Sequence, residues 1–213
     1  MSPTLSPRAR IAGLLLTLWA WACPPAFADA PLVDTVAATL ARPAVLRGRF
    51  EQDKQVVGFK KPLRSSGDFL LAGDRGVVWT TRQPFASELR LTRDSVSSRQ
   101  DGQVVFSLDA GREPGVRAVN QLLFALLTGD IRALAAQFKV DGDARQGHWS
   151  LRLTPLDPTL AKVLARIDLS GDDLVRQVEL DEGNGDHTFI RFSDLRPATD
   201  ALTPAEAALF DAR

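Results

Sequence analysis

Polar and apolar residues alternate along most of the chain beyond residue 44, and this period of two predicts short β-strands. In the first such segment Leu46 and Phe50 are apolar, while Arg47, Arg49 and Glu51 are charged. One face of the resulting sheet is therefore expected to contact water. The segments with this pattern or a strand-like composition are 46–51, 66–72, 77–81, 88–92, 104–108, 138–140, 149–154, 164–169, 174–180 and 188–192.

Turn-forming residues separate these segments. Gly73-Asp74, Asp101-Gly102 and residues 183–185 (Gly-Asn-Gly) fall between neighbouring segments, where glycine, asparagine and aspartate favour tight reversals. Roughly ten short strands at hairpin spacing predict one large antiparallel sheet, strongly curled.

Helical periodicity interrupts the strand pattern. Apolar residues spaced along one helix face over 32–40, followed by Pro43, predict a first helix. A shorter helix is expected over 131–136. Near the carboxyl end, residues 203–206 (Thr-Pro-Ala-Glu) are typical of an N-cap, a first-turn proline and a glutamate at the third helical position. The predicted fold class is therefore α+β.

The broadest apolar stripe belongs to a helix in the middle of the chain that stops at Gly129. Its members are Val116, Val119, Leu122, Leu123, Leu126 and Leu127, with Phe124 at the edge. An arc this wide needs apolar surroundings on more than one side, which a curled sheet can provide. Two interpretations stay open: the helix fills a β core, or it is a movable cover over a hollow apolar face.

The amino terminus has the pattern of a secretory signal peptide. Arg8 and Arg10 precede an apolar run over 11–22, which is too short to span a bilayer comfortably. Residues 26–28 (Ala-Phe-Ala) form a small-x-small pattern, so cleavage is expected after Ala28.

We accordingly predict a cleaved signal peptide over 1–28 and a single domain over 29–213. Lipidation at Cys23 is the alternative, but the residues around this cysteine, including Pro24, do not fit a lipidation site. A leader without a later membrane-spanning run predicts a soluble exported protein, periplasmic if the host has two membranes.

Composition excludes several functional classes. The 213 residues carry 26 basic and 26 acidic side chains, and this net charge of +0 argues against nucleic-acid binding. One cysteine allows no intrachain disulfide and no thiolate cluster for a metal. We expect neither a metal nor a cofactor.

Catalytic motifs are also missing from the sequence. The two histidines, His148 and His187, are expected at strand ends near the surface, and paired carboxylates such as Asp172-Asp173 fall at turns. We therefore expect no enzymatic activity. A hydrolase that depends on His148 or Asp186 is kept as an alternative.

An ordered set of strand residues resembles the periplasmic outer-membrane lipoprotein carriers of the LolA type. The matching residues are Phe50-x-Gln52, Gly67-Asp68-Phe69, Trp79 and Gln83-Pro84. The resemblance implies a half-open, curled antiparallel sheet, or incomplete barrel, covered by helices. Its apolar concave side would hold the acyl chains of a lipoprotein or lipid in transit.

The resemblance also implies partners. A carrier of this family receives cargo from an inner-membrane exporter and passes it to an outer-membrane acceptor, and we expect this one to be a monomer. A lipid-binding sensor on the same fold is the alternative. Strand alternation predicts a lipid-binding concave face of Phe50, Phe69, Leu71, Val77, Trp79, Leu89, Leu91, Phe106, Trp149 and Leu151, closed by Leu122, Leu123, Leu126 and Leu127.

The chain departs from the family at one turn. The lipoprotein carriers place a basic residue and a proline after the strand that begins near Gly67, where this chain has Gly73-Asp74. In the family this basic residue helps to control opening and cargo transfer. The nearest basic residue is Arg75, so cargo other than a lipoprotein stays open.

Overall fold

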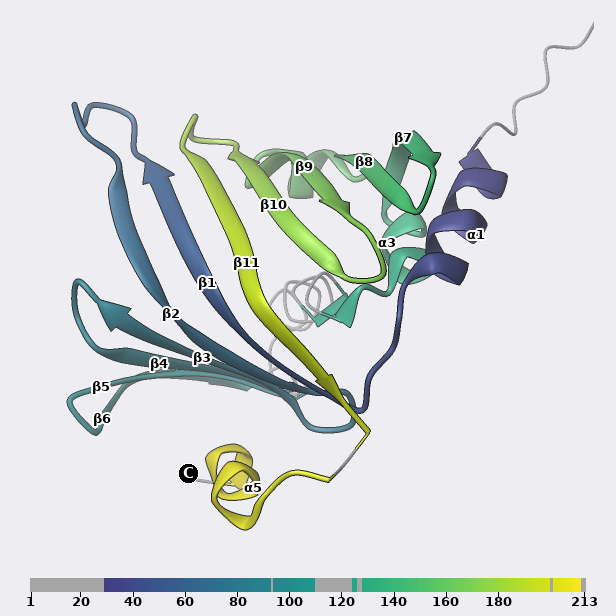
Figure 1. The fold of residues 1–213 in the computed structure, drawn as a ribbon. Coiled ribbons are helices and arrows are strands. Elements are labelled where there is room, and N and C mark those ends of the chain that lie inside the picture. Colours follow the sequence, from purple (N-terminus) through teal and green to yellow (C-terminus); the bar gives the residue numbers. More distant parts are fainter. Residues whose placement is uncertain (1–28, 93, 110–123, 126–127, 200, 212–213) are drawn as a thin grey trace, which may run out of the picture.

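The structure, a computed structural model, describes residues 29–92, 94–109, 124–125, 128–199 and 201–211. In these ranges the chain forms a large, unclosed antiparallel sheet of 11 strands with a few helices (Figure 1). The strands are β1 (Val45–Gln55), β2 (Leu63–Ala72), β3 (Gly76–Gln83), β4 (Ser87–Thr92), β5 (Ser95–Gln100), β6 (Gln103–Asp109), β7 (Phe138–Arg145), β8 (His148–Pro155), β9 (Leu164–Gly171), β10 (Val175–Glu182) and β11 (His187–Ala198). The helices are α1 (Asp29–Thr39), α3 (Ile131–Ala135), α4 (Pro158–Ala161) and α5 (Pro204–Asp211).

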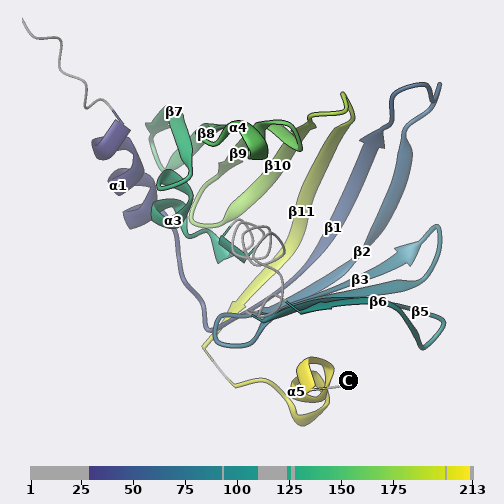
Figure 2. The same cartoon turned by 180° about the vertical axis from the view of Figure 1, so that it is seen from behind.

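The sheet consists of two meanders joined by the first and last strands. Its order is β6-β5-β4-β3-β2-β1-β11-β10-β9-β8-β7, so all neighbours but one are consecutive in sequence. The exception is the pair of β1 and β11. Figures 1 and 2 show the sheet curled around one concave side, with β2–β6 and β7–β10 on either side of this central pair.

The pairing register gathers the apolar residues on the concave face. Leu46 of β1 pairs with Leu71 of β2, which pairs with Val77 of β3, which in turn pairs with Leu91 of β4. Side chains of directly paired residues lie on the same face of a sheet. The alternation of apolar and polar residues in these neighbouring strands is therefore in phase, and it places the four residues on one face of the sheet.

The predicted antiparallel sheet is confirmed, and one strand was missed. The sequence of β5 (Ser-Val-Ser-Ser-Arg-Gln) has Val96 as its single apolar residue, so it carries no alternating pattern. The turn before β6 was anticipated. Asp101 and Gly102 both have positive φ angles, 50° and 77°, as a two-residue hairpin turn that follows the sheet twist requires.

Helices α1 and α3 pack together at the β7 end of the sheet. Val36 of α1 and Ile131 of α3 are fully buried in the main core, and Leu134 is 1% exposed. Both helices were predicted. Helix α4 was not predicted, because its single turn depends on Asp157, which accepts the backbone N–H groups of Thr159 and Leu160.

Helix α5 lies on the outer, convex face of the sheet (Figures 1 and 2). Phe210 of α5 packs against Val45, Leu70 and Val78, which alternate with the concave residues. This helix therefore does not cover the concave side. The middle helix predicted from the sequence is the one expected to cover that side. Of its residues, the structure describes only Phe124, Ala125 and those from 128 onward. A helix that covers the concave face therefore stays a prediction.

Candidate functional site

A cavity of about 660 Å³ lies on the concave face of the sheet. Strands β1 to β4, β10 and β11 form one part of its wall, and the α1–β1 connection and the segment before α3 form the other. The described residues that line it are Leu40, Ala41, Arg42, Pro43, Ala44, Leu46, Gln52, Phe69, Leu71, Gly73, Asp74, Trp79, Leu89, Phe124, Thr128, Gly129, Asp130, Leu174, Val175, Val178, Leu180, Ile190 and Phe192. Most of these side chains are apolar.

Four aromatic rings form a cluster beside this cavity. The rings of Phe50 and Trp79 stack with their centroids 3.9 Å apart, and Phe69 lies 6.1 Å from Trp79. Phe192 meets both Phe69 and Trp79 edge-on, at 5.3 and 6.0 Å. A side chain at Gly48 would stand 2.6 Å from the Phe69 ring, so glycine leaves room for this ring over β1. The cluster offers a broad, weakly polar surface to a hydrocarbon chain.

All ten described residues of the predicted concave face do share that face, by the pairing register. Four of them, Phe69, Leu71, Trp79 and Leu89, line the cavity. Whether any of the ten binds lipid stays a prediction.

The other predicted residues near these four are packed into protein. Phe50 is 1% exposed because Trp79 covers its ring. Val77 and Leu91 are 1% and 2% exposed and belong to the main core. Their position beside the cavity makes them supporting residues and not part of its lining.

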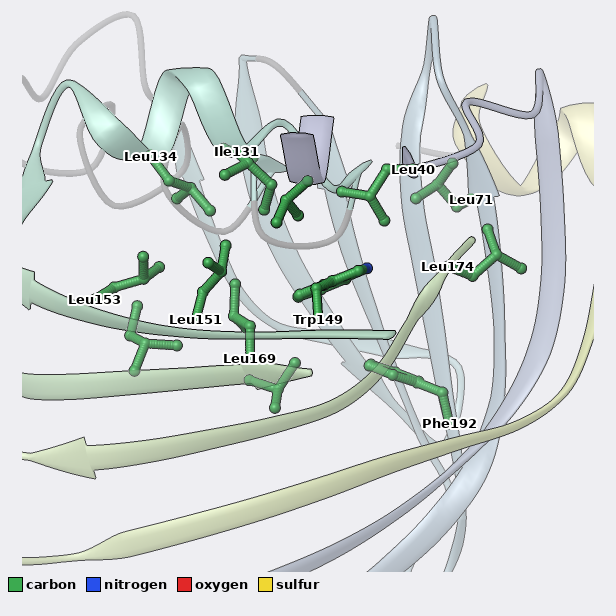
Figure 3. Close-up of a cluster of buried hydrophobic side chains, with 14 of the residues drawn as sticks. Leu40, Leu71, Ile131, Leu134, Trp149, Leu151, Leu153, Leu169, Leu174 and Phe192 are labelled. Carbon is green, nitrogen blue, oxygen red and sulfur yellow. The ribbon is translucent and has the colours of Figure 1, made fainter. Parts of the chain in front are cut away.

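The far end of the concave face is filled. Trp149 and Leu151 of β8 lie in the buried cluster with Ile131 and Leu134 of α3, as Figure 3 shows. The indole N–H of Trp149 donates to the backbone oxygen of Asp172 at 2.6 Å. At this end the filled-core interpretation therefore describes the sheet better than the hollow one.

Phe106 lies on the edge strand β6, whose side chains are all exposed, and it does not line the cavity. The four leucines predicted to close the site, Leu122, Leu123, Leu126 and Leu127, lie outside the described residues. Their neighbours Phe124 and Thr128 do line the cavity.

Sequence reasoning missed the part of the wall that β10 and β11 contribute. Val178 and Leu180 of β10 and Ile190 and Phe192 of β11 line the cavity. Alternation had placed all four in strands. Their approach to Trp79 depends on the pairing of β1 with β11, which joins residues far apart in sequence.

The charged groups of the lining gather at one end. Arg42 follows α1, Asp74 lies in the β2–β3 turn, and Asp130 precedes α3, where its carboxylate accepts the N–H of Ala133 at 3.2 Å. Arg42 has no ion-pair partner within the described part of the chain. The backbone N–H of Gly73 donates to the oxygen of Ala44 at 3.0 Å and connects the β2–β3 turn to the segment between α1 and β1.

Arg75 does not take part in this polar end. One of its guanidinium nitrogens lies 3.3 Å from the Asp211 carboxylate and 3.4 Å from the backbone oxygen of Ala207, both in α5. Because α5 packs on the convex face, Arg75 is directed away from the cavity.

His148 and Asp186, the two residues on which the alternative of a hydrolase depends, do not lie together in one site. His148 is exposed at the start of β8, whereas Asp186 lies beside the start of β11, at the opposite end of the sheet. Within the described ranges, no three histidine, cysteine, aspartate or glutamate residues are grouped to hold a metal. None of the described helices has both the length and the apolar character to cross a membrane.

The solved structures that are similar to this chain include three with a TM-score of 0.45 each. A LolA superfamily protein from Nitrosomonas europaea is 9% identical, with 81% of this chain and 94% of that chain covered. A DUF1329 family protein from Desulfovibrio piger is 11% identical, with 82% and 93% covered. A putative outer membrane lipoprotein-sorting protein domain from Vibrio parahaemolyticus is 10% identical, with 84% and 97% covered.

Sequence comparison assigns the family. A search of curated proteins found no match. The family model described as "Outer membrane lipoprotein carrier protein LolA-like" matches residues 22–208, which is most of the chain. The protein therefore belongs to the LolA-like family of outer membrane lipoprotein carrier proteins.

Proposed function

We propose that this protein is a periplasmic carrier that shields an acyl chain of a lipoprotein or lipid and delivers it towards the outer membrane. The observation that carries the proposal is the apolar cavity of about 660 Å³ beside Trp79, in a chain of the LolA-like family. In this proposal an inner-membrane exporter loads the carrier and an outer-membrane acceptor unloads it. The signal peptide predicted over 1–28 supplies the export.

The size of the cavity suits one acyl chain. A methylene group occupies about 27 Å³ at the packing density of protein interiors, so one sixteen-carbon chain fills about 430 Å³ and two fill about 860 Å³. Only the smaller volume fits within 660 Å³. The lining extends from Ala44, just before β1, to Gln52 of β1, a span of about 26 Å at 3.3 Å per residue. An extended chain of sixteen carbons measures about 20 Å and fits within this span.

Shielding such a chain is energetically substantial. Moving a methylene group from water to an apolar site is worth about 0.8 kcal/mol, so a chain of sixteen carbons gains on the order of 10 kcal/mol. Because the lining has few polar groups that could hold the acyl chain in one position, the chain can pass to an acceptor without a source of energy in the carrier. The charged end formed by Arg42, Asp74 and Asp130 is the place for the polar head of the cargo.

Native mass spectrometry tests this proposal. The purified protein is mixed with a lysophosphatidylglycerol that carries one sixteen-carbon chain, and bound lipid is counted. We expect one lipid per protein at saturation. Leu89→Gln places an amide in the cavity wall and is expected to weaken binding about tenfold.

Leu108→Gln is the matched control, because Leu108 lies on the same face in β6 but does not line the cavity. It should bind the lipid as the unmodified protein does. Absence of any bound lipid would contradict the carrier proposal, and two or more lipids per protein would contradict the capacity of one chain.

A further inference from the structure

Exposed apolar side chains gather at the tip of the hairpin formed by β1 and β2. Val57, Phe59 and Leu63 are 64%, 59% and 52% exposed. Figures 1 and 2 show this tip as a projecting end of the sheet, away from both α1 and α5. Contact of these side chains with water is unfavourable, and exposed apolar residues that cluster in this way mark an interaction site.

The same tip carries basic side chains. Residues 56–64 (Val-Val-Gly-Phe-Lys-Lys-Pro-Leu-Arg) contain three cations and no acid. Lys60 and Lys61 are exposed and have no ion-pair partner in the described ranges. Arg64 pairs with Asp53 at 3.0 Å, so the two lysines carry the uncompensated charge.

Hydrogen bonds hold the tip in a defined shape. The N–H of Phe59 donates to the oxygen of Val56 at 3.0 Å, and Gly58 between them has a φ of +87°, which closes a tight turn. The side-chain amide of Gln55 donates to the oxygen of Phe59 at 2.8 Å. These bonds satisfy the backbone within the turn and leave the side chain of Phe59 outside.

A buried carboxylate anchors this turn to the rest of the sheet. Asp186, 8% exposed, accepts the N–H of Val57 at 3.0 Å, and this bond lowers the pKa of its carboxyl below the usual range. Lys54 bridges Asp186 and Glu182 at 3.5 and 2.5 Å. The Asp186 carboxylate is therefore charged at neutral pH. Its bonds to Val57 and Lys54 fix the position of the tip, so that the apolar side chains there stay exposed to water.

We propose that the β1–β2 tip docks the protein on the surface of an anionic lipid bilayer, with Phe59 and Val57 entering the interface and Lys60 and Lys61 next to the head groups. Charge complementarity selects this partner, because lysines attract anionic head groups while aromatic and aliphatic side chains insert among the lipids. This inference goes beyond the carrier function, since it concerns the opposite end of β1 from the charged end of the cavity.

Vesicle co-sedimentation tests the docking. The probe is phosphatidylcholine vesicles with about 30 mol% phosphatidylglycerol, compared with phosphatidylcholine alone. We expect binding to the anionic vesicles that is at least tenfold stronger and that falls with added salt. Phe59→Ser should lower the partition coefficient about tenfold, and replacing Lys60 and Lys61 by Gln should lower it about 25-fold, at about fivefold per charge.

Phe85→Ser is the matched control. Phe85 is 74% exposed at the β3–β4 turn, and Arg82, the nearest basic residue in the sequence, is paired with Asp68. This variant should bind the anionic vesicles within twofold of the unmodified protein. Circular dichroism verifies that each variant is folded. If Phe59→Ser does not fold, the variant with both lysines replaced still tests the proposal, because Lys60 and Lys61 are exposed and their replacement removes no packing.

Two results would overturn the docking proposal: no binding of the unmodified protein to anionic vesicles, or tip variants that bind as tightly as it does. The first result would leave a protein as the partner of the tip, and the second would place the lipid contact on another surface. Uptake of lysophosphatidylglycerol into the cavity is measured separately, so failure of docking and failure of the carrier function are distinguishable.

Discussion

Leu180 and Leu153 flank the same residue, Ile167, in one row across the concave face. Leu180 lines the cavity, whereas Leu153 is fully buried in the core. We predict that Leu153→Ala lowers the free energy of unfolding by about 2–5 kcal/mol, because it leaves a void in close-packed surroundings. Leu180→Ala should cost about 1 kcal/mol, since its neighbourhood is already partly empty. Urea unfolding of both variants measures the difference.

Equal losses of unfolding free energy in these two variants would contradict a hollow interior next to β10. Binding of a single-chain lipid supplies the complementary measurement. It should weaken in Leu180→Ala and stay within twofold in folded Leu153→Ala.

Sequence alternation predicts which face of the sheet a side chain occupies but not what lies opposite that side chain. All ten described candidates share the concave face. Phe50 and Trp79 follow the same alternation, yet Phe50 is packed beneath the Trp79 ring and only Trp79 lines the cavity. This distinction depends on the packing of neighbouring rings, which period two does not contain.

Helix α5 is held on the convex face by a charged cap. Glu206 accepts the N–H of Thr203 at 2.8 Å, and Arg47 of β1 donates to the Glu206 carboxylate at 2.6 and 2.7 Å. The bonds from Arg47, followed by that from Thr203, lower the pKa of Glu206 from 4.5 to about 2. This cap joins the last helix to the first strand.

The lowered pKa predicts a pH-dependent contribution to stability. A carboxyl group whose pKa is depressed in the folded state stabilises the fold above its unfolded pKa, and this stabilisation is lost as pH falls through the folded value. The protein should therefore be about 1–2 kcal/mol more stable than Glu206→Gln at pH 7. The difference should shrink between about pH 4.5 and 2. Urea unfolding at several pH values measures it.

Glu51→Gln is the control, because Glu51 is exposed on the same strand as Arg47 and has no ion pair in the described part of the chain. It should change stability by less than about 0.5 kcal/mol at every pH. A pH-independent difference between Glu206→Gln and the unmodified protein would contradict the capping role.

Elements with a strong local signal could be predicted from sequence, and those without one could not. The cap of α5 was evident from Thr203, Pro204 and Glu206, whose spacing is that of a capping box. The edge-side strand β5 was missed because serines occupy most of its positions. An edge region needs less apolar surface, so its strands show weaker patterns.

The pairing of β1 with β11 determines the shape of the cavity. It joins two meanders and brings Trp79 and Phe192 to a ring distance of 6.0 Å. Sequence reasoning predicted a curled antiparallel sheet and, through the family resemblance, its half-open form. It could not show that one end of the concave face is filled by α1 and α3 while the other is hollow, because both ends have the same alternation.

The hollow end and the filled end each contain one tryptophan, and fluorescence quenching therefore shows which end an acyl chain contacts. Trp79 lines the cavity, whereas Trp149 is 3% exposed in the filled core. Residues 29–213 contain no other tryptophan. A long-chain fatty acid brominated near its middle quenches an indole that it contacts.

We predict that this brominated acid quenches the emission of residues 29–213 saturably, at one equivalent, and that a non-brominated acid competes for the site. In Trp79→Phe, the remaining emission of Trp149 should be unaffected. Emission that stays unquenched in the unmodified protein, or quenching that persists in Trp79→Phe, would contradict an acyl chain in the cavity beside Trp79.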